Sequence, residues 1–151
     1  MAGARTRPFK NRSLRALVTT AQRSDHMARV RRSGTGAELA VRKVLRALGI
    51  RFTVDNGDLP GSPDMANRTR RFAIFVHGCY WHRHSGCARA TTPSRNREFW
   101  EAKFDANVRR DRRVVRRLRR EGYTVVTIWE CRIDDLDALS RRLAKALSRG
   151  S

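Results

Sequence analysis

Two strand-like segments most constrain how this 151-residue chain can fold. Residues 72–76, FAIFV, are continuously apolar, and residues 123–129, YTVVTIW, are rich in β-branched and aromatic residues. Strands of this composition are typically covered on both faces rather than on one. We therefore expect a sheet with helices packed against both of its sides.

Three helices are predicted around these strands. The first begins with a capping box at Thr35–Glu38, has an apolar face and ends at Gly49. The second is a long helix of about 20 residues that ends at Gly122. The third opens at Asp134 and carries Leu136, Leu139, Leu143 and Leu147. With a further short strand at residues 51–54, the order predicts a mixed α/β sheet flanked by helices.

The net charge of the chain is strongly positive. It contains 34 Lys and Arg against 14 Asp and Glu, a formal charge of +20. Such a surface favours a polyanionic partner, by default nucleic acid. A basic face for acidic membranes is disfavoured, because no amphipathic basic helix ends in aromatic anchors, and no apolar run approaches membrane-spanning length. Eight of the arginines lie within residues 109–120, where we favour phosphate contact over a merely solvated helix face.

The chain length fits one domain. Residues 1–23 carry six basic residues and no acid, and could be a transit peptide, an arm that tracks phosphates, or the result of a start codon placed too early. We predict a basic, disordered extension over residues 1–23 and one domain over residues 24–151.

Residues 76–87, VHGCYWHRHSGC, hold three of the four histidines and two of the three cysteines. Cys79, His84 and Cys87 fall within nine residues, and Cys131 follows a later strand. An odd number of cysteines does not indicate a disulfide framework. A Cys₃His set fits tetrahedral, structural Zn²⁺, although three ordinary buried cysteines remain an alternative.

Acidic and histidine residues outside that set are candidates for catalysis. Asp64 precedes the strand at 72–76 and could help to hold Mg²⁺ against a phosphate, although an Asp after Pro is usually a turn residue. Glu38 has an equally good explanation as a helix cap. His77 and His82 could transfer a proton, or could be ordinary hydrogen-bonded loop residues.

Tyr80 and Trp81 are adjacent aromatic residues in the same segment. Neighbours on a strand point to opposite faces, so both cannot enter one core there. They could form a wedge against nucleic-acid bases, or one of them could pack in the core.

Taken together, these motifs closely resemble one family, the very short patch repair (Vsr) DNA mismatch endonucleases. The resemblance runs from Ser24 to Ile133 and rests on five segments in the same order: GAELAVRKVLRALGIRF, DLPGSPD, FAIFVHGCYWH, SRNREFWEAKFDANVRRDRR and WEC. It implies a restriction-endonuclease-like fold with a mixed central sheet and a structural zinc site. It also implies Mg²⁺-dependent nicking of duplex DNA on the 5′ side of the thymine in a T·G mispair, which arises when 5-methylcytosine deaminates.

The resemblance also implies roles for individual residues. Asp64 and the main-chain carbonyl of Val76 match the Mg²⁺ ligands, with two ions expected. His82 matches the catalytic histidine, and Glu38 and His77 match supporting positions. The zinc ligands would be Cys79, His84, Cys87 and Cys131. Met27, Tyr80 and Trp81 match the DNA wedge, with Tyr80 where Phe is usual, and the spacing from His84 to Cys87 is looser than expected.

Two other functions remain open. One is a restriction-type or repair nuclease without T·G selectivity, and the other is a zinc-stabilised DNA-binding protein that has lost catalysis. The resemblance implies a monomer in the cytoplasm, associated with the nucleoid. Mismatch-repair proteins and a cytosine-5 methyltransferase would be functional partners.

Overall fold

The structure is a computed structural model, and it describes residues 34–148. Its sheet has three strands in the order β1 (Met65–Asn67), β2 (Phe72–His77) and β3 (Thr124–Trp129). β1 pairs antiparallel with β2, and β2 pairs parallel with β3. The predicted mixed sheet with flanking helices is therefore confirmed.

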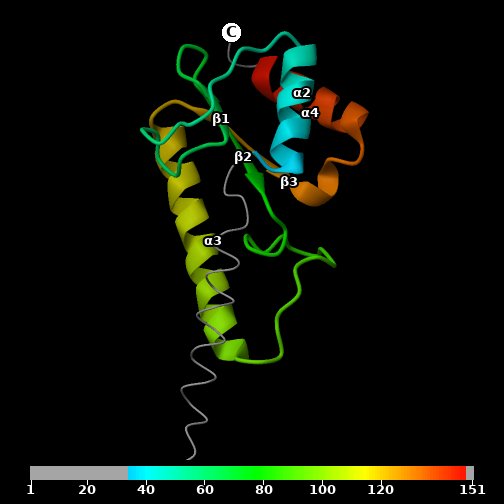
Figure 1. Cartoon of the computed structure of the whole chain (residues 1–151). Helices are drawn as coiled ribbons and strands as arrows, with labels where there is room; N and C mark the ends of the chain where they lie inside the picture. The colour runs from blue at the N-terminus through cyan, green and yellow to red at the C-terminus, as the bar shows by residue number, and fades with distance from the viewer. Residues whose placement is uncertain (1–33, 149–151) are drawn as a thin grey trace, which may run out of the picture. The chain divides into compact units, whose positions relative to one another are not determined.

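The two faces of the sheet are covered by different helices (Figure 1). α2 (Gly36–Ala47) and α4 (Leu136–Ser148) pack against one face, where Ile74 and Ile128 join their leucines and valines in the larger core. The long helix α3 (Arg97–Arg120) covers the other face, where Phe75 packs with Leu118. Because side chains alternate along β2, His77 lies on the same face as Phe75, the face covered by α3.

The structure contains the helix-capping features that the sequence predicts. Thr35 accepts a hydrogen bond from the Glu38 N–H through its hydroxyl, at 3.2 Å. Gly49 and Gly122 both have positive φ, and each follows its helix in a Schellman arrangement of backbone hydrogen bonds. A short 3₁₀ helix, η1 (Glu130–Arg132), connects β3 to α4 and carries Cys131.

Three local predictions need correction. The strand expected at residues 51–54 is only an isolated bridge between Thr53 and Ala66. Its partner is β1, which has three residues and is therefore too short to pair with more of this segment. The sequence pattern did not indicate β1. α3 has 24 residues rather than about 20. α4 begins at Leu136 rather than Asp134, and Asp135 caps it by accepting from Ala138 N–H at 2.9 Å. Leu136, the first residue of α4, is 43% exposed, whereas Leu139, Leu143 and Leu147 are buried.

None of the helices within residues 34–148 is both long enough and apolar enough to cross a membrane. Met27 and the predicted extension of residues 1–23 lie outside the described residues, as does the domain boundary at residue 24.

Candidate active site and metal centre

The loop before Asp64 is held in place by a buried asparagine. Asn56 is 1% exposed, and its side-chain amide donates to the carbonyl of Thr53 and to that of Pro63, both at 3.0 Å. Since Pro63 directly precedes Asp64, these bonds fix the backbone that carries the candidate metal ligand.

A close approach of Gly61 to α3 adds a second constraint on the same loop. Gly61 has φ +72°, and a Cβ at this position would lie 2.5 Å from Val114 Cγ1. Only glycine fits a backbone that is both left-handed and this close to a neighbour. The loop carrying Asp64 is therefore packed directly against α3.

Asp64 lies at the sheet edge, partly buried, and its Oδ2 accepts a hydrogen bond from the Val76 N–H at 2.6 Å. Burial raises the pKa of Asp64 to about 6, although the Val76 N–H works in the opposite direction. The negative charge of Glu38 raises this pKa further, whereas His82 and Arg42 lower it. Glu38 and His82, which are distant in sequence, are thus within electrostatic range of Asp64.

Glu38 is 4% exposed, which is rare for a carboxylate. Its Oε2 accepts from the Gly34 N–H at 2.7 Å and lies 3.4 Å from Arg42 Nη2. The cap role therefore exists, with the side chain reaching Gly34 rather than the Thr35 N–H of a standard capping box. Capping does not exclude a second role, because the same carboxylate acts electrostatically on Asp64.

His77 and His82 are stacked on the α3 side of the sheet. Their ring centroids are 3.8 Å apart and their planes differ by 6°. His82 Nδ1 lies 2.6 Å from Asp111 Oδ2 on α3. The ligand atoms of these three residues are close enough together for a metal ion, but parallel stacked rings direct their in-plane lone pairs side by side rather than towards one point. We therefore interpret this group as a proton-transfer arrangement.

The environment separates the two histidines chemically. Burial lowers the pKa of His77 to about 4, and the nearby charge of His82 lowers it too. His77 is consequently neutral at pH 7. His82 is instead paired with a carboxylate, which holds the proton on Nδ1 and leaves Nε2 for a reacting group.

Asp111 is a site residue that sequence reasoning missed. The available signal was its position as the one acid among eight arginines in residues 109–120. An acid in that position is also an ordinary surface residue of a helix, so only the contact with His82 identifies it.

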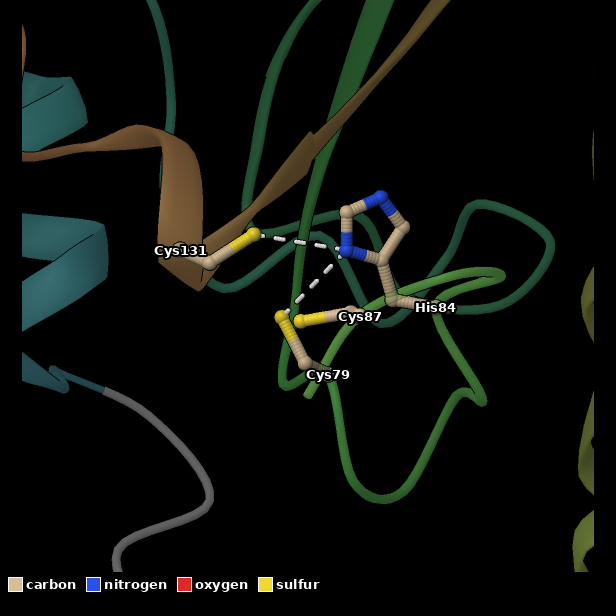
Figure 2. A group of neighbouring side chains, drawn as sticks. All are labelled: Cys79, His84, Cys87 and Cys131. Atoms are coloured by element: carbon tan, nitrogen blue, oxygen red, sulfur yellow. Dashed lines mark hydrogen bonds between the residues drawn. The ribbon is translucent and has the colours of Figure 1, made fainter. Parts of the chain in front are cut away.

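The four predicted zinc ligands converge in the structure. Figure 2 shows Cys79, His84 and Cys87 on the loop after β2 and Cys131 on η1, with their side chains pointing towards one another. Their ligand atoms all lie within 4.8 Å of one another. His84 Nδ1 lies 3.6 Å from Cys79 Sγ and 3.3 Å from Cys131 Sγ. A sulfur and a nitrogen bound tetrahedrally to Zn²⁺ would be about 3.6 Å apart.

The surroundings of this cluster favour a bound cation. Cys79 is fully buried, and burial raises the pKa of its thiol to about 11. A proton or a metal ion must therefore occupy the sulfur at neutral pH. The His84 ring is stacked on Trp129, with centroids 4.3 Å apart, and Glu130 Oε1 accepts from the Cys79 N–H at 3.2 Å. These contacts fix the orientation of the ligands, so the cluster is well suited to zinc.

Tyr80 and Trp81 belong to an aromatic group on the N-terminal half of α3. Tyr80 packs edge-to-face against both Trp81 and Phe104, with centroids 5.1 and 5.2 Å apart. Trp100 lies 6.2 Å from Trp81, and Lys103 Nζ lies 5.3 to 5.5 Å from both indole rings. Tyr80 and Trp81 are half-buried, so each retains surface that a ligand can reach.

A cleft of about 570 Å³ lies beside the stacked histidines and reaches His84 of the zinc cluster. Its lining includes His77, His82, His84 and Asp111, together with arginines of α3. A cleft with histidines, a carboxylate and guanidinium groups suits a phosphodiester better than a neutral ligand.

Comparison with known proteins identifies the family of this chain. A sequence profile described as DNA mismatch endonuclease Vsr matches residues 16–89. The chain is 42% identical to the type II nicking enzyme V.XorIIP of Xanthomonas oryzae pv. oryzae over 121 residues, covering 80% of this chain and 88% of that enzyme. It is 37% identical to the DNA mismatch endonuclease Vsr of Escherichia coli over 120 residues, covering 80% of this chain and 76% of that protein.

A third relative is the type II nicking enzyme V.NmeDIP of Neisseria meningitidis serogroup C. It is 38% identical over 112 residues, which cover 74% of this chain and 76% of the enzyme. Matches of this identity and coverage, together with the convergence of the candidate residues, establish that the chain belongs to the DNA mismatch endonuclease Vsr family and is a DNA-nicking endonuclease of that family.

Proposed function

We propose that this endonuclease nicks duplex DNA on the 5′ side of the thymine in a T·G mispair, by Mg²⁺-dependent hydrolysis of the phosphodiester. The observation that carries the chemistry is the pair of His82 and Asp111, stacked against a neutral His77 in a basic cleft. The selectivity is supported by the aromatic group beside that cleft.

The metal-binding part of the site consists of oxygen donors. Asp64 and the main-chain carbonyl of Val76 would hold Mg²⁺, with Glu38 as a supporting acid. Carboxylate and carbonyl oxygens are the ligands this ion takes in proteins, and a cation here would offset the two buried negative charges. When bound, two Mg²⁺ ions would stabilise the attacking and leaving oxygens of the phosphodiester.

The histidines divide the proton transfer between them. Asp111 holds His82 with Nε2 directed away from the ion pair, where it can take a proton from the attacking water or give one to the leaving oxygen. His77, neutral because its pKa is about 4, serves as a fixed wall and hydrogen-bonding group rather than a proton donor. Cys79, His84, Cys87 and Cys131 would hold one structural Zn²⁺ that fixes the loop bearing His82.

Recognition of the mispair would depend on Met27, Tyr80 and Trp81 as a wedge. A wobble pair is stacked less well than a Watson–Crick pair, so separating it from its neighbour costs less. Tyr80 and Trp81 are braced from behind by Phe104 of α3, which would keep the wedge rigid as it enters the base stack.

The alternative is a nicking enzyme of the same fold without T·G selectivity. Its support is that the relative with 42% identity is described as a type II nicking enzyme, a description that mentions no mismatch. For the mismatch-selective enzyme we propose a monomer that acts in the cytoplasm at the nucleoid, with mismatch-repair proteins and a cytosine-5 methyltransferase as functional partners.

Strand-resolved cleavage of labelled duplexes with Mg²⁺ tests the proposal. T·G, fully paired and other mispaired duplexes would be compared in several flanking sequences, with Asp64→Ala as the inactive control. A nick in the thymine strand of the T·G duplex alone is the expected result. Equal nicking of paired DNA would overturn the selectivity, and binding without a cut would overturn the catalysis.

A further inference from the structure

The arginines of α3 line a second groove, separate from the cleft that contains the catalytic histidines. This groove has a volume of about 770 Å³, and the Pro60–Gly61 turn forms its opposite wall. Arg113, Arg117 and Arg120 line this groove but not the catalytic cleft, whereas Arg112 lines only the cleft. The arginine run is thus divided between two concave surfaces.

Two residues connect these surfaces. Arg116 and Arg119 line both the cleft and the second groove, so a continuous basic band crosses α3 between them. An α-helix with its side chains is about 10–12 Å wide, and successive phosphates of one DNA strand advance about 3.4 Å along the duplex axis. On a duplex whose axis crosses α3, a band of this width corresponds to about three nucleotide steps.

The arginines of the second groove have few partners of their own. Arg117 is paired with Glu121 at 3.1 Å. No carboxylate within residues 34–148 forms an ion pair with Arg113, Arg116, Arg119 or Arg120. Like charges three or four residues apart on a helix repel one another, so this arrangement is unfavourable unless an anion binds there.

We propose that the second groove binds the sugar–phosphate backbone of the DNA substrate about three nucleotides from the scissile phosphate. Guanidinium groups bind phosphate oxygens in a bidentate manner, and several of them along one helix suit a row of phosphates rather than a single small anion. The apolar wall formed by Pro60 and Gly61 adds no competing carboxylate. This inference rests on DNA being the substrate, but not on T·G selectivity.

The first test measures how DNA binding depends on salt. The triple variant Arg113→Gln, Arg117→Gln and Arg120→Gln is compared with a matched variant, Lys43→Gln, Arg141→Gln and Lys145→Gln. The matched variant loses the same charge from exposed positions on α2 and α4. Fluorescence anisotropy with a 25-base-pair T·G duplex, between 50 and 300 mM NaCl, gives the slope of log Kd against log salt.

For the groove variant, we expect the slope to fall by about two to three and the dissociation constant at 150 mM NaCl to rise about tenfold or more. The matched variant should change both quantities much less. Equal changes in the two variants would overturn the proposal, because they would show a general charge effect rather than a site.

The second test locates the bound phosphate. Single methylphosphonate substitutions remove one phosphate charge at a time along each strand. The expected result is a position about three nucleotides from the cut where substitution weakens binding of the wild type but not of the groove variant. The proposal is contradicted if every methylphosphonate that weakens binding of the wild type also weakens binding of the groove variant.

These measurements require no cleavage. A result that contradicts T·G-selective nicking can therefore be distinguished from a result that contradicts phosphate binding in the second groove. If the triple variant unfolds, Arg113→Gln and Arg120→Gln are measured singly, since neither residue forms an ion pair with a described carboxylate. Each should then lower the slope by about one.

Discussion

His82 and Asp111 join the loop after β2 to the middle of α3, with Nδ1 and Oδ2 2.6 Å apart. The two residues are 29 positions apart in the chain, and each is about one-fifth exposed. Both side chains are therefore mostly buried, and the contact holds the His82 ring against α3. In the proposed mechanism, the contact determines which nitrogen of His82 is free to face the reacting group.

We expect Asp111→Asn to slow nicking by at least about 100-fold, because an amide does not stabilise the protonated ring or hold one tautomer. Single-turnover nicking rates under saturating Mg²⁺ and DNA measure this effect. DNA affinity and the melting temperature should change much less than the rate, because an amide of the same size keeps the packing of this side chain.

Asp105→Asn is the matched control for that substitution. Asp105 lies on the same helix and is exposed, so the same loss of charge should leave the nicking rate within about twofold of wild type. Comparable slowing by both substitutions would show that α3 acts only through its total charge.

The raised pKa of Asp64 gives a pH dependence for the metal requirement. Its pKa is about 6, above the usual range, so the carboxylate form that would bind Mg²⁺ is lost as pH falls through 6. About one-quarter of Asp64 is ionised at pH 5.5 and nearly all at pH 7.5. The Mg²⁺ concentration for half-maximal nicking should therefore rise about fourfold from pH 7.5 to pH 5.5.

Glu38→Gln provides a second check on this interpretation. The charge of Glu38 helps to raise the pKa of Asp64, so its removal should move the pH dependence of Mg²⁺ binding to lower pH. Isothermal titration of Mg²⁺ at a series of pH values separates this effect from changes in the chemical step. A half-activating concentration that is constant between pH 5.5 and 7.5 would rule out Asp64 as the titrating ligand.

Loss of the zinc cluster should destabilise the fold before it affects the chemistry. Cys131→Ser removes the ligand on η1 that connects the loop to the end of β3. We expect the purified wild type to contain one Zn²⁺ per chain and the variant to lose it. The melting temperature should fall by at least about 10 °C, as for the loss of several kcal/mol. Metal analysis and calorimetry measure both quantities.

Ser85→Ala tests whether any change in this loop would have the same effect. Ser85 is exposed and lies between two of the ligands, so its substitution should leave both metal content and melting temperature unchanged. A wild type without zinc, and equal melting temperatures for all three proteins, would show that the cluster does not bind the metal.

The parts of the fold that the sequence predicted are those with strong local patterns. The capping box at Thr35 and the glycines at 49 and 122 mark helix ends through local hydrogen bonds, and they lie as expected. β1 has only three residues and depends on pairing with β2, so its own composition carried little signal. The same holds for the bridge at Thr53.

The site residues likewise divide into those that the sequence indicated and those that it did not. Cysteines are rare in this chain, so the short spacing between Cys79 and Cys87 was enough to indicate a metal site. The structure brings Cys131 to the same cluster. Asp111 was hidden because a single acid in a basic helix is ordinary, and its partner depends on how α3 crosses the sheet. Likewise, the pKa values of Asp64 and His77 result from burial, which no spacing of residues reveals.

The wedge proposal makes a prediction for selectivity rather than for rate alone. Trp81→Ala should reduce the preference for T·G over paired duplexes by about 5- to 150-fold, because stacking of an aromatic side chain on a base contributes about 1–3 kcal/mol. The ratio of kcat/KM values for the two duplexes measures this preference directly. The slow cleavage of paired duplexes should change little, since the cleft is lined by His82 and Asp111 and not by Trp81.

Tyr80→Phe separates the ring from its hydroxyl group. The Tyr80 ring packs edge-to-face on Phe104, and this contact does not need the hydroxyl, so selectivity should be kept or increased slightly. Unchanged selectivity in Trp81→Ala would mean that the aromatic group serves only to pack the loop on α3. That outcome would appear as a lower melting temperature of Trp81→Ala with an unchanged preference for T·G. A residue that only packs the loop changes the stability of the protein, but it does not distinguish one duplex from another.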